Sequence, residues 1–278
     1  MQPNVAIVIL NWNGWPDTVL CLASLQKLEY SNCHALVVDN GSTDDSVARI
    51  REQYPEVEVI ELGRNVGFAA GCNAGIARAM RQHADYIWLL NNDTTVDSNA
   101  LRSLVDKAES SQEIGAVGSA IYFADQPDRL QAWGGGKITF WLGRSRHFLA
   151  PVPDERIEFI TGASLLLSAR AIEEVGPLDE NFFMYWEDAD YCFRLRRAGW
   201  KLAVAGDSKV WHKGSASVGP KSARMDAYFN ASAARFFHAH APVPEFTLWT
   251  GVALRILKRI FAGDWDRARA VWQSVHGA

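Results

Sequence analysis

The chain has 278 residues, of which 48% are hydrophobic and 22% charged, ordinary values for a soluble globular protein of one large α/β domain or two small ones. The formal net charge of −4 and the lack of a basic run argue against a nucleic-acid partner. The four cysteines have no paired spacing, no leader-like segment precedes the first strand pattern, and no apolar run reaches the ~18 residues of a membrane span. We therefore expect a cytoplasmic protein.

The first part of the chain alternates predicted strands with predicted helices. Apolar runs predict buried strands at residues 5–10, 35–38, 57–62, 86–90 and 114–122. Helices are expected between them, and Ser42 with Asp45 three residues later resembles a capping box for the helix that ends near Gln53. Because such strands pair in parallel through right-handed crossovers, we expect an α/β fold with a mostly parallel, doubly wound sheet flanked by helices.

Polar side chains follow three of these strands, at the point where each strand ends. They are Asn11 to Asn13, Asp39 with Asn40, and Asn92 with Asp93. In sheets of this kind, ligands bind beyond the carboxyl ends of the strands. Three polar strand ends at one edge therefore predict a nucleotide site more strongly than any single one.

The second part of the chain is less regular. Residues 134–136, all glycine, indicate a flexible break, and residues 141–158 are typical of a mobile loop. Further elements are expected as strands at 159–167, 202–205 and 209–211 and as helices at 222–239 and 244–262, followed by a tail to Ala278. We predict one domain over residues 1–240, with a nucleotide-binding half at 1–120 and a second half at 121–240, and a helical C-terminal appendage at 241–278.

Residues 176–200 carry the densest group of charges. Acidic residues stand where a helix would begin and basic residues where it would end, as the helix dipole favours: Glu187, Asp188, Asp190, then Arg194, Arg196, Arg197. Tyr185 and Trp186 directly precede the acids, and aromatic walls beside a partly desolvated carboxylate are typical of a sugar site with a base. The residues alone leave both interpretations open, a well-capped helix or a catalytic base.

Several common catalytic patterns are absent. No G-x-G-x-x-G follows the first strand, and the chain has no G-x-x-x-x-G-K-[ST], G-x-S-x-G or H-E-x-x-H. Dinucleotide oxidoreductases, nucleotide triphosphatases, serine hydrolases and zinc proteases are therefore set aside.

Seven segments, taken in order, resemble the motifs of inverting family 2 glycosyltransferases, with the nearest likeness to the rhamnosyltransferase-like branch. They are ILNWNG (9–14), VVDNGSTDDS (37–46), RNVGFAAGCN (64–73), LLNNDT (89–94), TGASLLL (161–167), FFMYWEDADYCFRLRRAGW (182–200) and WHKGS (211–215). The resemblance implies a GT-A fold, a nucleoside diphosphate sugar donor and a divalent cation, Mn²⁺ or Mg²⁺. It covers roughly residues 4–235.

The resemblance also implies a role for each matching residue. Asp188 would be the catalytic base, and the acceptor would contact Tyr185, Trp186 and Glu187. The residues expected to bind the nucleotide sugar are Trp12, which would stack on the base, and Asn13, Asp39, Asn65, Asn92 and Asp93. Asp93 and His212 would hold the metal; the family's D-x-D motif reads N-N-D here, which leaves Asp93 as its one carboxylate.

The resemblance favours deoxythymidine diphosphate rhamnose (dTDP-rhamnose) as donor, with a uridine diphosphate (UDP) sugar as the alternative. It implies a glycan or lipid-linked acceptor in cell-envelope polysaccharide synthesis. In the helix at 244–262, an apolar face (Trp249, Val252, Ala253, Ile256, Ile260) is expected opposite a basic one (Arg255, Lys258, Arg259). That apolar face would either lie on the inner face of the membrane or, slightly favoured, pack on this domain or on a second subunit.

Two other classes of function remain open. A relative that binds a sugar nucleotide without turnover is supported by the altered N-N-D motif, and donor binding without transfer would identify it. A nucleotidyltransferase on a similar sheet ranks third, because Asn11-Trp12-Asn13-Gly14 is not the glycine-rich, basic loop that such enzymes carry after the first strand.

Overall fold

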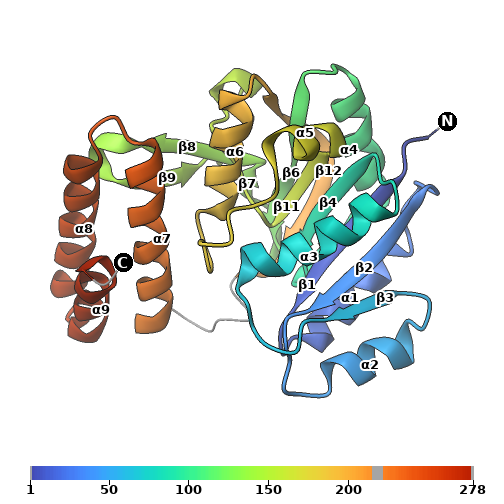
Figure 1. The fold of residues 1–278 in the computed structure, drawn as a ribbon, viewed down its shortest axis with the longest axis horizontal. Helices are drawn as coiled ribbons and strands as arrows, with labels where there is room; N and C mark the ends of the chain where they lie inside the picture. The colour runs from blue at the N-terminus through green and yellow to red at the C-terminus, as the bar shows by residue number, and fades with distance from the viewer. Residues whose placement is uncertain (1, 215–221, 277–278) are drawn as a thin grey trace.

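The computed structural model describes residues 2–214 and 222–276. Its main sheet has nine strands within these residues, in the order β3-β2-β1-β4-β11-β6-β12-β5, with β7 paired to β6. Figure 1 shows this sheet with helices on its faces and with α7, α8 and α9 gathered at the opposite end of the molecule from β1–β3. The predicted α/β class, with helices flanking a sheet and a helical C-terminal region, is confirmed.

The first half of the chain forms the parallel part of the sheet. Its strands are β1 (Val5–Asn11), β2 (Cys33–Asp39), β3 (Glu58–Glu61) and β4 (Tyr86–Asn91), and the helices that connect them are α1 (Trp15–Leu25), α2 (Ser46–Gln53) and α3 (Phe68–Arg81). Residues 5–9 of β1 are at most 1% exposed, as expected for a strand covered on both faces. α3 packs so close to the sheet that a Cβ atom at position 75 would lie 2.3 Å from Val8 Cγ1. Gly75, which has no Cβ atom, permits this close packing.

The second half adds antiparallel pairs and one long parallel pair. Its strands and helices are β5 (Thr94–Val96), α4 (Ala100–Glu109), β6 (Ile114–Phe123), β7 (Gln126–Trp133), β11 (Ser164–Ser168), α5 (Ala169–Val175), α6 (Glu187–Arg197) and β12 (Lys201–His212). β11 lies antiparallel between β4 and β6, and β12 runs parallel to β6. The two short strands predicted within residues 202–211 are one strand with a register shift between Ala205 and Lys209.

A second, three-stranded sheet overturns two predictions. Residues 134–136 were expected as a flexible break and 141–158 as a mobile loop, but β8 (Gly135–Thr139) pairs antiparallel with both β9 (Arg144–His147) and β10 (Phe159–Ile160). A Cβ atom on Gly135 would lie 1.8 Å from the carbonyl oxygen of Phe159, so this glycine permits close strand contact. The predicted strand at 159–167 is accordingly divided into β10 and β11.

The predicted capping box at the start of α2 is wrong. The residue before this helix is Asp45, whose side chain makes no capping hydrogen bond, and the first helical N–H, that of Ser46, donates to Asp44 Oδ1 at 3.0 Å. The Ser42 hydroxyl instead donates to Asp39 Oδ1 at 2.6 Å, because the chain turns back on the end of β2 here. Ser42 thus stabilises a strand end and not a helix.

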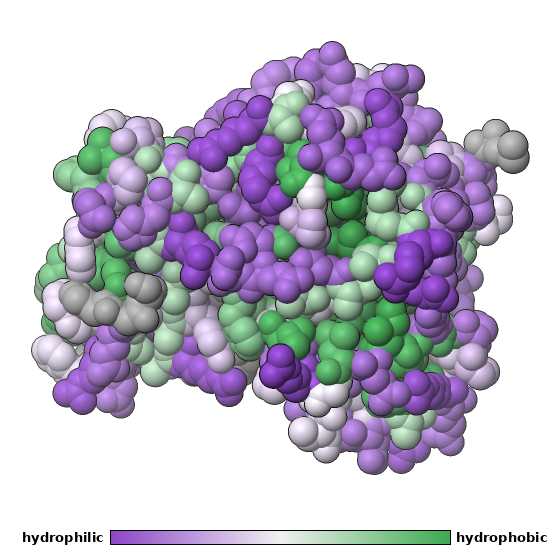
Figure 2. Space-filling view, in the orientation of Figure 1, coloured by the Kyte–Doolittle hydropathy of each residue, from purple (hydrophilic) through white to green (hydrophobic). Residues whose placement is uncertain are grey.

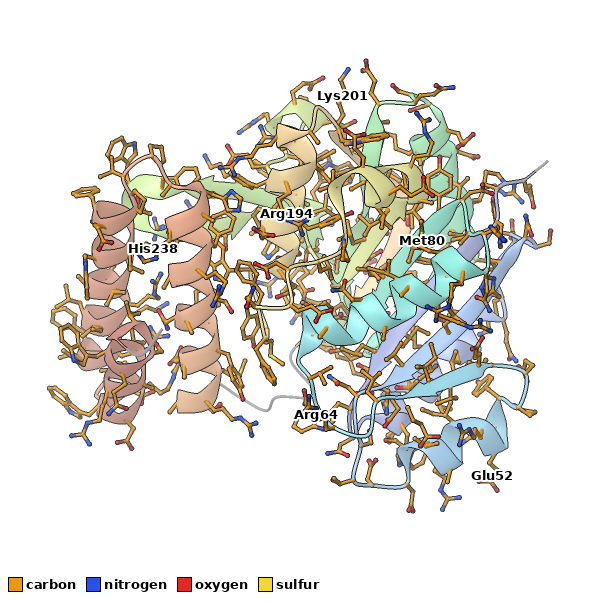
Figure 3. The ribbon with its side chains drawn as sticks, viewed as in Figure 1. Glu52, Arg64, Met80, Arg194, Lys201 and His238 are labelled. Carbon is orange, nitrogen blue, oxygen red and sulfur yellow. The ribbon has the colours of Figure 1, made fainter. Side chains whose placement is uncertain are left out.

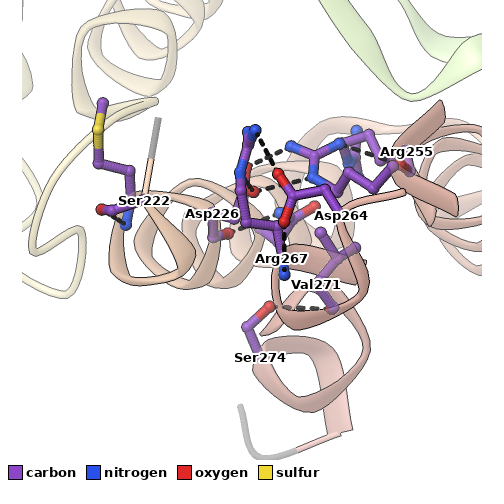
Figure 4. A network of polar contacts seen from close by, with 10 residues as sticks. Ser222, Asp226, Arg255, Asp264, Arg267, Val271 and Ser274 are labelled. Atoms are coloured by element: carbon purple, nitrogen blue, oxygen red, sulfur yellow. Dashed lines mark hydrogen bonds and ion pairs between the residues drawn. The ribbon is translucent and has the colours of Figure 1, made fainter. Parts of the chain in front are cut away.

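The C-terminal segment folds as three helices that pack together: α7 (Ala223–His240), α8 (Pro244–Phe261) and α9 (Trp265–His276). The tail predicted after residue 262 is therefore mostly helical, and residues 277–278 lie outside the described residues. Asp226 of α7 accepts hydrogen bonds from Arg259 Nε at 2.8 Å and from Arg267 Nε at 2.6 Å (Figure 4). The division of the chain at residue 240 stays a prediction.

The orientation of α8 corrects the predicted basic face. Arg259 points inward to Asp226, and Arg255 Nη1 donates to the carbonyl oxygen of Gly143 at 2.7 Å. Val252 and Ile256 of the predicted apolar face pack on α7 and α9, as the slightly favoured alternative expected. The outward face exposes Phe246, Leu254, Leu257 and Phe261 beside Lys258. Figure 2 shows hydrophobic residues in green along the left edge, where Figure 1 places α8. Among the described residues, no helix is both long enough and apolar enough to span a membrane.

Candidate active site

A cavity of about 340 Å³ lies beyond the carboxyl ends of β1 and β4. Its other walls are β9, the turn at residues 161–163, the start of α6 and the end of β12. Most of the predicted site residues line it, namely Trp12, Asn65, Asn92, Asp93, Tyr185, Trp186, Glu187, Asp188 and His212. Asn13 and Asp39 are not among the lining residues.

Trp12 and Asn65 stand at the strand-end side of the cavity. The Trp12 side chain is half-buried, which leaves part of its ring accessible to a ligand. Asn65 Oδ1 accepts from Asn40 Nδ2 at 3.2 Å and from the Gly67 N–H at 3.0 Å, so the loop before α3 is tied to the end of β2. Arg64 lies in the same loop (Figure 3). Stacking of Trp12 on a base stays a prediction.

The side chains of Asp39 and Asn13 accept hydrogen bonds from the loops beside the cavity. Asp39 is 3% exposed, and its carboxylate accepts from Asn11 Nδ2 at 2.9 Å and from the Ser42 N–H at 2.9 Å. Asn13 Oδ1 accepts from the Thr43 N–H at 2.8 Å. These bonds join the loops after β1 and β2, and the predicted contacts of both residues with the nucleotide remain predictions.

Asp93 and His212 meet at the end of the cavity where β5 pairs with β12. His212 Nε2 lies 3.2 Å from Asp93 Oδ1 and 3.3 Å from Asn91 Nδ2, and both His212 and Asp93 are largely buried. Asn92 is turned away from this pair, because its Nδ2 donates to Thr18 Oγ1 at 3.1 Å. Of the segment 211–215, Ser215 lies outside the described residues.

The residues at this end fit a divalent cation whose shell is completed by a ligand. One carboxylate and one imidazole suit Mn²⁺ or Mg²⁺ when phosphate oxygens and water fill the remaining positions. The described part of the chain contains no group of three or more His, Cys, Asp or Glu side chains arranged for a metal. The described residues at this end thus present one carboxylate and one imidazole, and a diphosphate would have to supply further ligands.

The two aromatic residues before α6 have an unusual backbone. Tyr185 and Trp186 both have φ of 69°, the left-handed region that non-glycine residues rarely adopt. Trp186 is 4% exposed and packs on Phe236 and Phe237, with ring centroids 4.9 and 5.1 Å apart. Tyr185 is half-buried and contacts Phe229, which also lines the cavity. Strain of this kind is concentrated at functional sites.

Asp188 is the carboxylate held at the start of α6. Its Oδ2 accepts from the Gly162 N–H at 2.9 Å and its Oδ1 from the Ala189 N–H at 2.7 Å, so both its position and its orientation are fixed. Burial raises the pKa of Asp188, and these backbone donors oppose that rise. A carboxylate with a raised pKa at a cavity wall can accept a proton from a bound hydroxyl.

Glu187 differs from Asp188 although the two are adjacent. Its side chain is 6% exposed, and Oε2 is buried without a hydrogen-bond partner. Burial, and after it the charge of Asp188, raises the pKa of Glu187 well above the ordinary value. Glu187 is therefore suited to hold a proton and donate a hydrogen bond, and Asp188 to accept one.

Asp190, in the first turn of the same helix, joins α6 to α7. Arg194 Nε donates to Asp190 Oδ2 at 2.8 Å, and His240 Nε2 lies 2.7 Å from Oδ1. Burial would raise the pKa of Asp190, but the hydrogen bonds of His240 and Arg194 hold it below the ordinary value. Arg194 projects from α6 in Figure 3. This acid has a structural role, as the charge order alone indicated.

Three polar residues near the cavity were missed by the sequence analysis. Ser145 and His147 of β9 line the cavity, and Gln131 of β7 contacts His212, with Oε1 2.7 Å from Nδ1. Residues 144–147 contain no apolar residue, so no alternation of apolar and polar side chains indicated β9. No sequence signal pairs Gln131 with His212, because the contact depends on the folded sheet.

The chain is similar to known glycosyltransferases. A family model described as glycosyl transferase family 2 matches residues 6–176. The N-acetylglucosaminyl-diphospho-decaprenol L-rhamnosyltransferase of Mycobacterium tuberculosis is 26% identical over 244 residues, which cover 79% of this chain and 79% of that protein. The dTDP-rhamnosyl transferase RfbF of Shigella flexneri is 23% identical over 228 residues, 81% of this chain and 73% of that protein.

A solved structure supports the fold. The mannosyltransferase PcManGT of Pyrobaculum calidifontis, determined in complex with GDP-Man and Mn²⁺, matches with a TM-score of 0.62 and 15% identity over 100% of this chain and 76% of that chain. At this identity the likeness concerns the fold alone. The predicted GT-A type of α/β fold is thereby confirmed.

Proposed function

The chain belongs to glycosyl transferase family 2, and we propose that it transfers rhamnose, with inversion, from a nucleoside diphosphate to a glycan or lipid-linked acceptor in cell-envelope polysaccharide synthesis. The observation that carries the proposal is the single cavity that brings together Asp188 from α6 and the pair Asp93–His212 from β5 and β12. Transfer from a diphosphate needs these two groups, a base for the acceptor and a charge partner for the leaving group.

In the proposed reaction, Asp188 takes the proton of the acceptor hydroxyl as that oxygen attacks the anomeric carbon. Glu187 and Tyr185 orient the acceptor, and Trp12 stacks on the base of the donor. Asp93 and His212 would hold a divalent cation, and a cation there would supply positive charge against the charge that develops on the diphosphate. A single displacement inverts the anomeric carbon, so no second carboxylate is required as a nucleophile, unlike in retaining glycosidases.

The proposed donor is dTDP-rhamnose, with UDP-sugars as the alternative. The name of the Shigella flexneri relative, a dTDP-rhamnosyl transferase, supports this choice. A lipid-linked acceptor is supported by the name of the Mycobacterium tuberculosis relative, which specifies a decaprenol diphosphate.

A lipid-linked acceptor would explain why the outward face of α8 exposes aromatic side chains. That face exposes Phe246 at 52% and Phe261 at 87%, and aromatic residues favour the interface between lipid and water. We therefore propose that the enzyme works in the cytoplasm and contacts the inner face of the membrane through α8. Flotation with anionic liposomes should fail for the double variant Phe246→Ser, Phe261→Ser and persist for Leu20→Ser, a control on α1 that is 51% exposed. Dimerisation through this face without lipid binding would contradict the proposal.

The function itself is tested with a panel of nucleoside diphosphate sugars in the presence of Mn²⁺. Release of nucleoside diphosphate is measured with and without glycan and polyprenyl-diphosphate acceptors. We expect release from dTDP-rhamnose that depends on the acceptor. Tight donor binding without transfer to any acceptor would favour a binding-only relative and contradict the proposed enzyme.

A further inference from the structure

His147 lies in one row with a glycine and a phenylalanine across the three-stranded sheet. Phe159 of β10 pairs with Gly136 of β8, and Gly136 pairs with His147 of β9. Residues that pair directly across antiparallel strands share a face of the sheet, so these three are neighbours on one face. Gly136 has no side chain to separate the other two, and the ring centroids of His147 and Phe159 lie 5.4 Å apart. The strand pairing therefore sets where the imidazole lies.

That face is part of the cavity wall. The cavity is lined by His147, by Phe159 and by Ser145, two positions before His147 on β9. Arg146, between Ser145 and His147, is exposed and is not among the lining residues, as the alternation of side chains along a strand requires. β9 therefore presents two polar side chains to a bound ligand, from a segment that the sequence analysis did not include in the site.

Asp188, the proposed base, is the charged group with the largest effect on this ring. Burial lowers the pKa of His147, and the Asp188 carboxylate, followed by a backbone hydrogen bond with Gly135, opposes that fall, whereas the effect of His212 is smaller. Burial raises the pKa of Asp188, and His147 is among the groups that oppose that rise. The imidazole is therefore associated with Asp188 more than with His212.

His147 has the chemistry to bind a hydroxyl group. Although protein surrounds the ring closely enough to disfavour its charge, His147 keeps an exposed surface on which a ligand can lie. A neutral imidazole has one N–H donor and one acceptor nitrogen, and a hydroxyl group also donates and accepts. Gly135 can bond only one of the two nitrogens, so the other can bond a ligand. In the proposed reaction, one acceptor hydroxyl lies within hydrogen-bond distance of Asp188, so the other hydroxyls of that sugar face the residues around this acid.

We propose that His147 binds a second hydroxyl of the acceptor sugar and so selects which hydroxyl of that sugar reaches Asp188. The inference rests on the proposed function, in which Asp188 is the base, and adds a residue of β9 to the acceptor side of the cavity. The alternative is a structural histidine that only packs on Phe159. His147→Phe separates the two cases, because it keeps an aromatic ring beside Phe159 and removes both ring nitrogens.

The first test is calorimetric binding of four probes, the octyl glycosides of glucose, galactose, mannose and N-acetylglucosamine, in the presence of dTDP. We expect the wild type to bind at least one of them. His147→Phe and His147→Ala should bind that glycoside roughly 3–10-fold more weakly, the loss expected for one hydrogen bond between uncharged groups. Arg146→Ala, on the same strand but outside the cavity lining, is the matched control and should bind as the wild type does. Unchanged binding by His147→Phe would overturn the proposal.

The second test identifies the hydroxyl. Monodeoxy forms of the bound glycoside are titrated into the wild type and into His147→Ala. One form should bind the wild type more weakly by the same factor and should bind His147→Ala without further loss, because the effects of two groups that contact each other are not additive. Additive losses for every monodeoxy form would contradict the proposal.

Donor binding separates this inference from the proposed function. The Kd of dTDP-rhamnose should be unchanged in His147→Phe, and a loss confined to this donor would place His147 on the donor side and overturn the inference. If the wild type binds dTDP-rhamnose and none of the glycosides, the acceptor role of the cavity and this inference fail together. Because these are binding measurements, a protein that transfers no sugar would fail the proposed function and leave this inference standing.

Discussion

His240 of α7 and Asp190 in the first turn of α6 are joined through His240 Nε2 and Asp190 Oδ1, 2.7 Å apart, and both side chains are almost completely buried. The helix that begins beside Asp188 is thereby fastened to the C-terminal helices. Because a buried carboxylate that loses a partner keeps its desolvation cost, His240→Ala should lower the free energy of unfolding by about 1–3 kcal/mol. Urea denaturation measures this change. His238→Ala is the control, since its side chain is 52% exposed, and an equal loss there would contradict the assignment.

Asp226 holds the three C-terminal helices together. Arg259 and Arg267 both donate to its carboxylate, which is 9% exposed, and these bonds hold its pKa below the ordinary value against the effect of burial. Breaking a buried charge pair costs about 3 kcal/mol, so Asp226→Asn should destabilise the protein by roughly that amount. Thermal and urea unfolding report it. Glu245→Gln, at a side chain that is 69% exposed, should have no measurable effect.

Glu187 should make stability depend on pH. Its pKa is raised in the folded protein, so the folded state favours the protonated form. The stability associated with that proton is fully present below the unfolded pKa, near 4.5, and is lost as pH rises through the raised folded pKa. Glu187→Gln removes this loss, so the variant should gain stability relative to the wild type as pH rises above about 4.5. A stability difference that does not vary with pH would contradict the raised pKa.

Asp93 and His212, the proposed metal ligands, should affect sugar transfer through the binding of the donor. Excess chelator should abolish transfer, and Mn²⁺ or Mg²⁺ should restore it. Asp93→Ala should weaken donor binding in the presence of Mn²⁺ and have little effect without it, because in the proposed mechanism the carboxylate would contact the diphosphate only through a cation. Isothermal titration calorimetry with and without Mn²⁺ separates these cases, and Asp125→Ala at an exposed turn is the control. Full activity in excess chelator would rule out the metal role.

Much of the fold could be predicted because local sequence patterns determine the strands and helices of the first half of the chain. A strand buried on both faces reads as a continuous apolar run, as residues 5–10 do. Polar residues in the sequence mark the ends of β1, β2 and β4. The motif order predicted the family, and the family model confirms it. The helix charges also predicted α6, which begins at Glu187 and ends at Arg197.

The errors occurred where contacts distant in sequence override local preference. Gly135 favours flexibility in isolation, but in the fold it lets β8 contact β10 closely, and the supposed loop that follows contributes His147 to the cavity. Arg259 was expected on the outward face because a helix pattern alone does not show that Asp226 lies beneath it. Sequence periodicity predicts that a face exists, and only the tertiary structure shows what covers it.

Asp188→Asn tests whether Asp188 is the catalytic base, but the substitution also removes a hydrogen-bond acceptor. The carboxylate accepts one backbone N–H on each oxygen, and an asparagine can replace only one of these acceptors. The variant therefore needs an unfolding measurement beside its kinetics. Glu187→Gln is the matched neighbour, and we expect it to act mainly through the acceptor KM.

The decisive measurement is the rate of sugar transfer by Asp188→Asn together with its donor Kd, determined by calorimetry on folded protein. A general base contributes ~10²–10⁴ in rate and little to the ground-state affinity for the donor. We predict that transfer falls by at least ~10²-fold while the donor Kd changes by less than a few-fold, and that Glu187→Gln loses less. Near wild-type transfer by Asp188→Asn, or a larger loss in Glu187→Gln, would contradict the assignment of Asp188 as the base.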